Sequence, residues 1–154
     1  MKQEKSKEDA YYKLCYYTGA HSDPFFIHQL AVDAFGAQHA DENTKPIGLV
    51  FALIGLYLYI EKNYSGREVQ IAHVKLGKHR KQWPTFDLPE YRGNITIYDV
   101  LAAPEGPERD EMIHKWRISV WDAYSESHEK VADLVETELY DRQKKRKNLR
   151  YNPK

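Results

Sequence analysis

The sequence predicts an all-α protein, a single-domain bundle of about five to seven helices. Apolar residues recur at helical spacing in most segments, two capping boxes mark helix starts, and runs typical of strands are nearly absent. The chain has 154 residues, the size of one domain. A domain of this length buries ~70% of the surface that its unfolded chain exposes, which is enough for a real core.

Composition and charge narrow the class of protein. The chain carries 23 Lys and Arg and 23 Asp and Glu, so no overall basic field favours nucleic acid as a partner. Cys15 is the one cysteine, which excludes an internal disulfide and a four-cysteine zinc site. The N-terminal segment is charged and leads into no apolar signal core, so we expect a cytoplasmic protein.

The first two predicted helices follow a short N-terminal segment. Residues 1–6 are expected to be disordered, and a helical domain is expected over residues 7–145. Lys7 to Thr18 mixes charged and apolar residues at helical spacing. The second helix is predicted to start at Ser22-Asp23-Pro24, because Asp23 can cap it and proline fits the first helical position, and to run to about Ala40.

The third predicted helix is the most hydrophobic segment of the chain. Pro46 to Ile60 holds 15 uncharged residues. As a helix it would be roughly 22 Å long, short of the ~30 Å hydrocarbon layer of a membrane. We therefore expect a helix buried in the protein core and no membrane span.

The fourth helix is expected to begin at the capping box of Ser65 and Glu68 and to end near Gly77. The next stretch, residues 78–93, has no clean period, and its Trp-Pro and Leu-Pro steps disfavour helix. We predict a long ordered loop there. Three aromatic side chains are expected to hold it down: Trp83, Phe86 and Tyr91.

The C-terminal third is predicted to be helical as well. A capping signal at Thr96 opens a short helix, and Pro107 with its acidic neighbours opens the next. Apolar residues then continue at helical spacing to about Lys145, as one long helix or two. Residues 146–154 are a basic tail, which we expect to be a frayed helix end.

The predicted second helix contains an unusual density of polar side chains, within HSDPFFIHQLAVDAFGAQHA. On a helix, His28 and His39 would stand about 16 Å apart along the axis, so they cannot hold one metal ion. Any metal site must therefore include residues of other elements. A structural interpretation is also open, in which four side chains hydrogen-bond between helices and fix their register: His28, Asp33, Gln38 and His39.

A functional interpretation places a site where the start of the second helix meets the fourth helix. In a metal version, Asp23 orients one imidazole and a divalent ion is held by His21, His28 and His73. In an anion version, Arg67 and the helix start bind a carboxylate or phosphate. The predicted ligand-binding residues are Asp23, Asp33, Gln38, His39, Arg67 and Gln70.

The segment HQLAVDAFGAQH, residues 28–39, resembles an uncharacterised bacterial family catalogued only as a domain of unknown function. The pattern of that family is H-x-L-x-V-D-A-[YF]-x-x-Q-H. Three later blocks resemble the family in the same order: ALIGLYLYIE, TIYDVLAA and SVWDAYSESH. The likeness therefore spans most of residues 11–135. Some relatives carry a cysteine pair near the N-terminus. This chain has Cys15 alone there, so a zinc-ribbon role does not transfer. The resemblance implies a single domain and identifies no reaction.

Two hypotheses for the function follow. The first is a small helical protein that binds a divalent metal or a small polar ligand near the start of the second helix. The second is a non-enzymatic assembly protein that forms a homodimer through the last helical region, where apolar residues lie on more than one side: Trp116, Val120, Trp121, Tyr124 and Leu134. The sequence does not decide whether the protein is an enzyme.

Overall fold

The computed structural model describes residues 2–20, 27–79 and 82–141 of the chain. Within these ranges the protein is all-α, as predicted, with seven helices and no strand. A 3-10 turn (Ser125–Ser127) precedes the last helix and a π-helical turn (Glu136–Asp141) follows it. The helices are α1 (Lys2–Ala20), α2 (Ile27–Gln38), α3 (Pro46–Lys62), α4 (Gly66–His79), α5 (Ile97–Ala102), α6 (Pro107–Ala123) and α7 (His128–Val135).

Local sequence signals set the helix boundaries. Pro46 begins α3 and Pro107 begins α6, as expected for a residue whose missing N–H costs nothing at the first position. The α3 helix ends where Asn63 adopts a left-handed conformation, with φ of 58°. The predicted capping boxes before α4 and α5 are both present: the Ser65 hydroxyl accepts from the Glu68 N–H, and Thr96 pairs in the same way with Asp99.

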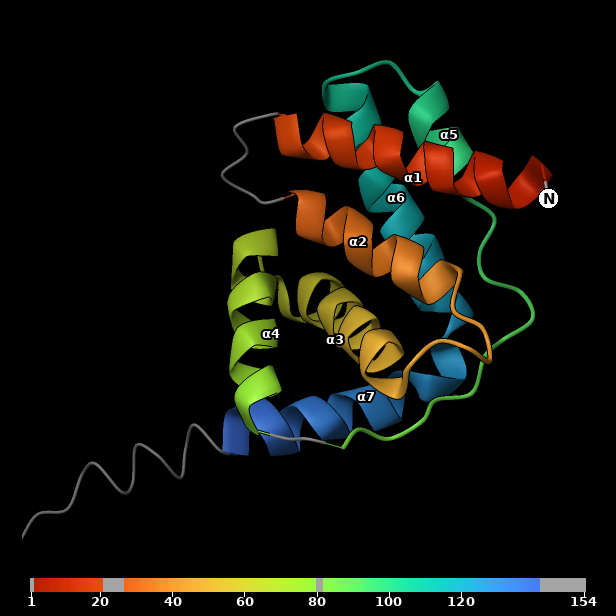
Figure 1. Cartoon of the computed structure of the whole chain (residues 1–154). Coiled ribbons are helices and arrows are strands. Elements are labelled where there is room, and N and C mark those ends of the chain that lie inside the picture. Colours follow the sequence, from red (N-terminus) through yellow and green to blue (C-terminus); the bar gives the residue numbers. More distant parts are fainter. Residues whose placement is uncertain (1, 21–26, 80–81, 142–154) are drawn as a thin grey trace, which may run out of the picture.

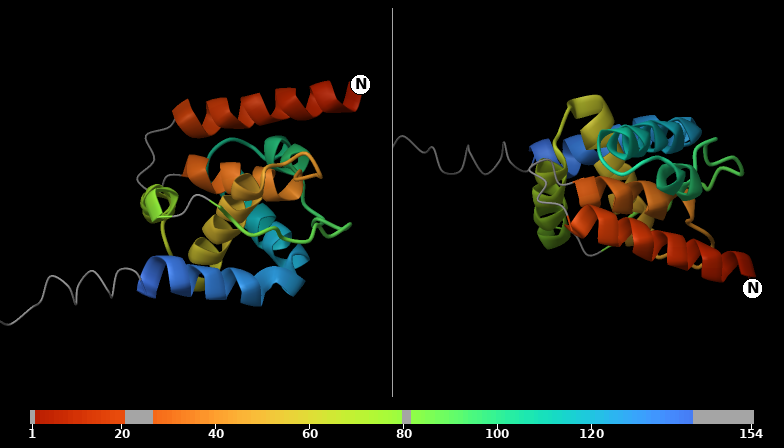
Figure 2. Two further views of the ribbon diagram at one scale, coloured as in Figure 1. Left: turned by 60° about the horizontal axis from the view of Figure 1, so that its bottom comes forward. Right: turned by 90° about the horizontal axis from the view of Figure 1, so that it is seen from above.

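The central layer of the fold is made by α2 and α3, which pack against each other (Figure 1). In Figure 1, α1 and α5 lie above them, α4 lies to one side and α7 lies below. Figure 2 shows that α6 passes behind this layer. The core is contributed mainly by α3, with Leu53, Ile54, Leu56 and Leu58 fully buried. No helix in the described part of the chain is long and apolar enough to cross a membrane.

An ordered loop is present over residues 82–96, between α4 and α5, close to the predicted range of 78–93. Residues 78–79 were expected in the loop but belong to α4. Trp83 and Phe86 are buried, as expected, whereas Tyr91 is 64% exposed and does not hold the loop down. Arg92 has that role instead, because its guanidinium donates to backbone carbonyls at the end of α2, including that of Ala40 over 2.9 Å. The loop is therefore held by its buried aromatic side chains and by an arginine that satisfies carbonyls at and just after the end of α2.

Residues 2–6, expected to be disordered, belong to α1. The predicted dimer surface is buried inside the protomer, since every one of its five side chains, among them Trp116 and Tyr124, is at most 9% exposed. The tail at residues 146–154 lies outside the described residues.

Candidate functional site

Asp33 lies on the face of α2 that packs against α3, and it is 3% exposed. Its carboxyl group occupies the space that a side chain on Gly55 would need. A Cβ added to Gly55 would lie 2.0 Å from Asp33 Oδ2 and 2.6 Å from Cγ. Only a residue without a side chain therefore permits this placement of the acid.

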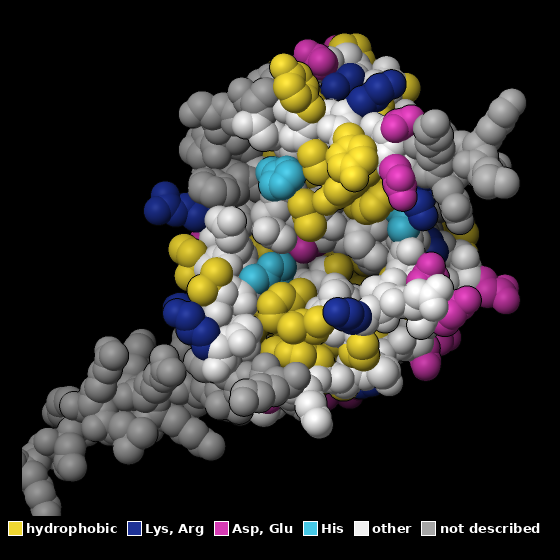
Figure 3. All heavy atoms as spheres, in the orientation of Figure 1, with side chains coloured by type: hydrophobic (Ala, Val, Ile, Leu, Met, Phe, Trp, Pro, Cys, Tyr) yellow, Lys and Arg dark blue, Asp and Glu magenta, His cyan; other side chains and the backbone are white. Residues whose placement is uncertain are grey.

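A hydrogen-bonded chain leads from Asp33 to α4. Gln29, one turn earlier on α2, donates from Nε2 to Asp33 Oδ1 over 3.0 Å, and the same nitrogen lies 3.5 Å from Nδ1 of His73. Nε2 of His73 donates to the backbone oxygen of Phe51 over 2.8 Å. Gln29 thus links the buried acid of α2 to an imidazole of α4. Figure 3 shows the face on which α2, α3 and α4 meet, with histidine side chains around a hollow at its centre.

The imidazole of His73 is neutral at physiological pH. Burial lowers the pKa of His73 to about 4, although its hydrogen bond to Phe51 opposes the shift. The unfolded chain binds a proton at His73 below about pH 6.5 and the folded chain does not. This histidine therefore contributes stability that is present above pH 6.5 and is lost as the pH falls toward 4.

We expect His73→Gln to remove this acid-sensitive contribution, because glutamine can still donate to Phe51 and does not titrate. The free energy of unfolding of the wild type minus that of the variant should rise by up to about 1.4 kcal/mol per pH unit as the pH rises from 4 to 6.5. Above pH 6.5 this difference should stay constant. Urea unfolding at half-unit pH steps measures it. A difference that does not change with pH would contradict a buried neutral imidazole.

Arg117 of α6 is a second group that acts on Asp33, apart from the hydrogen bonds through Gln29. Its side chain is fully buried. Its guanidinium carbon is 3.8 Å from the ring centroid of Tyr59, a close cation–π stack. Within the described part of the chain, none of the three guanidinium nitrogens has a hydrogen-bond partner, and neither has Oδ2 of Asp33. Such unpaired buried groups are costly in a core and are concentrated at functional sites.

Burial dominates the electrostatics of both groups. It raises the pKa of Asp33 to about 8, against the opposing effects of the Arg117 charge and of the hydrogen bond from Gln29. It lowers the pKa of Arg117 to about 10, against the effects of Asp33 and Tyr59. Near neutral pH, Asp33 is therefore a mostly protonated acid beside a buried cation.

The stacked Tyr59 continues the polar network to a cavity of about 380 Å³. Its phenol oxygen is 2.8 Å from Nδ1 of His114 on α6. Asp110 and Glu111, two acidic residues from the first turns of the same helix, also line the cavity. The remaining lining comes from the starts of α2 and α4 and from α6: Ile27, Leu30, Ser65, Gly66, Pro107 and Ile113.

The two polar residues at the other end of α2, Gln38 and His39, make different contacts. Gln38 donates to the backbone oxygens of Arg92 and Ile95 and accepts from the indole N–H of Trp116 over 2.8 Å. The His39 ring lies beside the Phe35 ring in a tilted arrangement, with centroids 4.4 Å apart. Burial and nearby cations lower the pKa of His39 to about 4. Gln38 thus ties α2 to α6 and to the loop before α5. Within the described residues, Nε2 of His39 has no hydrogen-bond partner, so His39 does not make the inter-helix hydrogen bond that the structural interpretation expected.

The predicted site residues are only partly brought together. Asp33 and His73 belong to one network through Gln29, which the sequence interpretation left out. His28 is exposed and its Nδ1 lies 2.8 Å from the Thr18 hydroxyl. The other predicted members of the site are exposed on α4 (Arg67 and Gln70) or lie outside the described residues (His21 and Asp23).

The described residues contain no group of three or more His, Cys, Asp or Glu side chains that could hold a metal ion. The metal set His21, His28 and His73 includes one residue outside these ranges, so it stays a prediction. His73 could offer only Nδ1 to a metal, because Nε2 already bonds to Phe51.

Four residues of the network were absent from the sequence-based site: Gln29, Tyr59, His114 and Arg117. Arg117 carried a detectable signal. It lies four residues after Ile113 and three before Val120, which places a charged residue in the apolar stripe of its helix. Tyr59 and His114 carried none, because their pairing depends on how α3 packs against α6.

A family model described as "Family of unknown function (DUF5946)" matches residues 4–125 of the chain. The chain belongs to this family. No curated protein and no solved structure matches this chain. The matched range contains the whole network of the DUF5946 chain, from Gln29 to Arg117, together with the cavity at its end.

Proposed function

We propose that this DUF5946 protein binds a small organic cation with an apolar body in the cavity between the starts of α2, α4 and α6. The observation that carries the proposal is the lining. Two carboxylates, Asp110 and Glu111, share a cavity of about 380 Å³ with the hydrogen-bonded pair of Tyr59 and His114. The volume is in the range of small-molecule sites, which are mostly apolar with a few placed polar groups.

The charge of the wall selects the class of ligand. Among the described residues, no lysine or arginine lines the cavity, whereas the two acidic residues are consecutive on α6. Tyr17 donates to Oδ1 of Asp110 over 2.8 Å and so holds this carboxylate in place. An ammonium group near Asp110 and Glu111 gains Coulomb energy, and an anion there is repelled. The apolar walls, including Leu30 and Ile113, are buried and suit a hydrocarbon body.

The buried network behind Tyr59 supports a binding role for this end of the molecule. Arg117 covers one face of the Tyr59 ring, which fixes the phenol toward His114. A buried guanidinium without hydrogen-bond partners weakens a core, so its presence is explained better by a function at Tyr59 than by stability.

Three probes of similar size test the proposal: benzylammonium, benzyl alcohol and benzoate, titrated by isothermal calorimetry. We expect benzylammonium to bind with a Kd on the order of 1 mM, the affinity of a fragment, and the neutral and anionic probes to bind at least tenfold more weakly. Equal affinity for benzoate, or no binding of benzylammonium, would refute the proposal.

A pair of charge-neutralising variants locates the effect. Asp110→Asn with Glu111→Gln keeps the shape of the wall and removes both charges, so the affinity for benzylammonium should fall about tenfold or more. Glu108→Gln is the matched control, because Glu108 is exposed on the same helix turn and does not line the cavity. If Glu108→Gln lowered the affinity as much as the double variant, the negative charge of α6 as a whole would attract the cation, and the cavity would not be the binding site.

A divalent metal held by His21, His28 and His73 is the alternative ligand. Metal analysis of protein purified without an affinity tag distinguishes the two. Metal at one equivalent per chain, lost in His73→Gln, would favour the alternative.

A further inference from the structure

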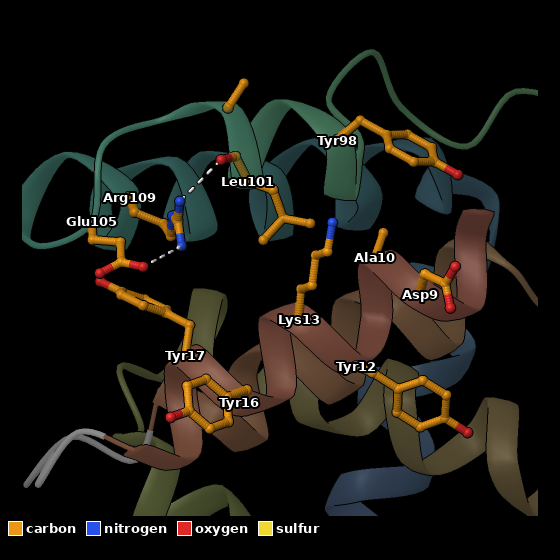
Figure 4. Close-up of a pocket in the computed structure, with 11 residues that line it drawn as sticks. Asp9, Ala10, Tyr12, Lys13, Tyr16, Tyr17, Tyr98, Leu101, Glu105 and Arg109 are labelled. Atoms are coloured by element: carbon orange, nitrogen blue, oxygen red, sulfur yellow. Dashed lines mark hydrogen bonds and ion pairs between the residues drawn. The ribbon is translucent and has the colours of Figure 1, made fainter. Parts of the chain in front are cut away.

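Helix α1 presents a face of exposed aromatic and charged side chains. Tyr12 is 67% exposed and Tyr16 is 80% exposed, and both Asp9 and Lys13 are exposed beside them. Residues at these spacings of three and four lie on one side of a helix. In Figure 4, Tyr12 and Tyr16 lie on one side of α1, and Lys13 points from α1 toward α5.

A groove lies beside this face, between α1, α5 and the start of α6, and its floor is fixed (Figure 4). Tyr17 and Arg109 lie between α1 and α6, with the guanidinium carbon of Arg109 4.8 Å from the Tyr17 ring centroid. Arg109 also donates to the backbone oxygen of Leu101 at the end of α5 over 2.9 Å. The floor is thus satisfied within the protomer, whereas the tyrosines at the rim expose large aromatic surfaces that tend to mark protein interfaces.

We propose that this face of α1 pairs with α1 of a second copy of the chain, antiparallel, about a two-fold axis that passes between Tyr12 and Lys13. In that register Asp9 faces the partner's Tyr16, and Tyr12 faces the partner's Lys13. Each contact then occurs twice, as a two-fold axis requires.

The occupant is a second copy because the face complements itself. One acid, one base and two phenols are arranged so that reversing the helix places a phenol O–H against the carboxylate of Asp9 and a cation against the ring of Tyr12. An overall acidic or basic partner would satisfy only one of the two charges. The proposal is independent of the cavity at the start of α2.

The same substitution at three exposed tyrosines tests the register, with the dissociation constant of the dimer measured by sedimentation equilibrium. We expect the wild type to dimerise with a Kd on the order of 10–100 μM, at the weak end for a small interface. Tyr12→Lys should weaken the dimer at least tenfold, because it sets two lysines against each other. Tyr16→Lys should not, because the new lysine meets the partner's Asp9. Tyr91→Lys, on the loop after α4, is the control that should change nothing.

A rescue completes the test. Adding Lys13→Glu to Tyr12→Lys restores opposite charges across the axis, and dimerisation should return to within about threefold of the wild type. Far-ultraviolet circular dichroism of each variant should match the wild type, since the replaced side chains are exposed. A wild type that is monomeric at concentrations on the order of 500 μM would overturn the proposal. So would a dimer that Tyr12→Lys leaves intact, or one that Tyr16→Lys weakens equally.

Discussion

Replacing Gly55 with alanine is expected to lower the free energy of unfolding by about 3 kcal/mol, the upper end of the range for overpacking a core. The new Cβ would lie 2.0 Å from Oδ2 of Asp33, so the buried carboxyl must move. It cannot move without disturbing its hydrogen bond from Gln29 and its place between two packed helices. Urea unfolding followed by circular dichroism measures the change.

A glycine-to-alanine substitution at another position of α3 should raise the free energy of unfolding instead of lowering it. A Cβ on Gly48 would meet only Thr44 Cγ2, at an ordinary 3.7 Å, and Gly48 is exposed. Gly48→Ala should therefore stabilise the protein by about 0.5–1 kcal/mol, through helix propensity alone. Adding Asp33→Ala to Gly55→Ala removes the clashing atoms and should recover part of the loss. If Gly55→Ala were as stable as the wild type, Asp33 would not lie against α3.

Replacing Asp33 with asparagine should stabilise the protein at alkaline pH and leave it nearly unchanged near pH 4. Burial raises the pKa of Asp33 from 3.8 to about 8 in the folded state. Between these values the unfolded chain has released the proton and the folded chain retains it, so the wild type loses stability as the pH rises. Asparagine has no proton to release. The advantage of the variant should thus grow by up to about 1.4 kcal/mol per pH unit from pH 4 to 8.

Urea unfolding of both proteins at each pH from 4 to 9 measures this advantage, and the contribution of His73 cancels because both proteins carry it. Asp133→Asn, on an exposed position of α7, is the control and should show no such trend. The charge of Arg117 lowers the pKa of Asp33, so Arg117→Met should extend the trend to higher pH. An Asp33→Asn variant that is less stable than the wild type at pH 8 would show an ionised carboxylate paired with Arg117.

Most of the fold was predictable because its signals are local. Proline at a first helical position and reciprocal capping boxes act within one turn of the chain, and they placed the starts of α3, α4, α5 and α6 correctly. The break between α6 and α7 was left open by the sequence. It is made by a 3-10 turn where the His128 ring stacks on Trp121, with centroids 3.8 Å apart, which is a contact that periodicity does not encode.

The sequence interpretation and the proposed cavity share a region of the fold but few polar residues. The sequence placed it where the starts of the second and fourth helices meet, and the cavity is lined there by Ile27 and Gly66. Its polar groups come from α3 and α6, because Tyr59 and His114 are 55 residues apart and meet only through packing. Helical spacing relates residues within one helix, so it could connect Gln29 with Asp33 and could not connect Asp33 with Arg117.

The location of the bound cation is measured most directly by amide chemical shifts of the nitrogen-15-labelled wild type during titration with benzylammonium. We expect the largest shifts at the end of α3, the start of α4 and the first turns of α6, around Tyr59, Gly66 and His114. Benzoate at the same concentration should leave these amides unshifted. Benzylammonium shifts confined to the groove between α1 and α5, or equal shifts with benzoate at the cavity, would contradict a cation site at the start of α2.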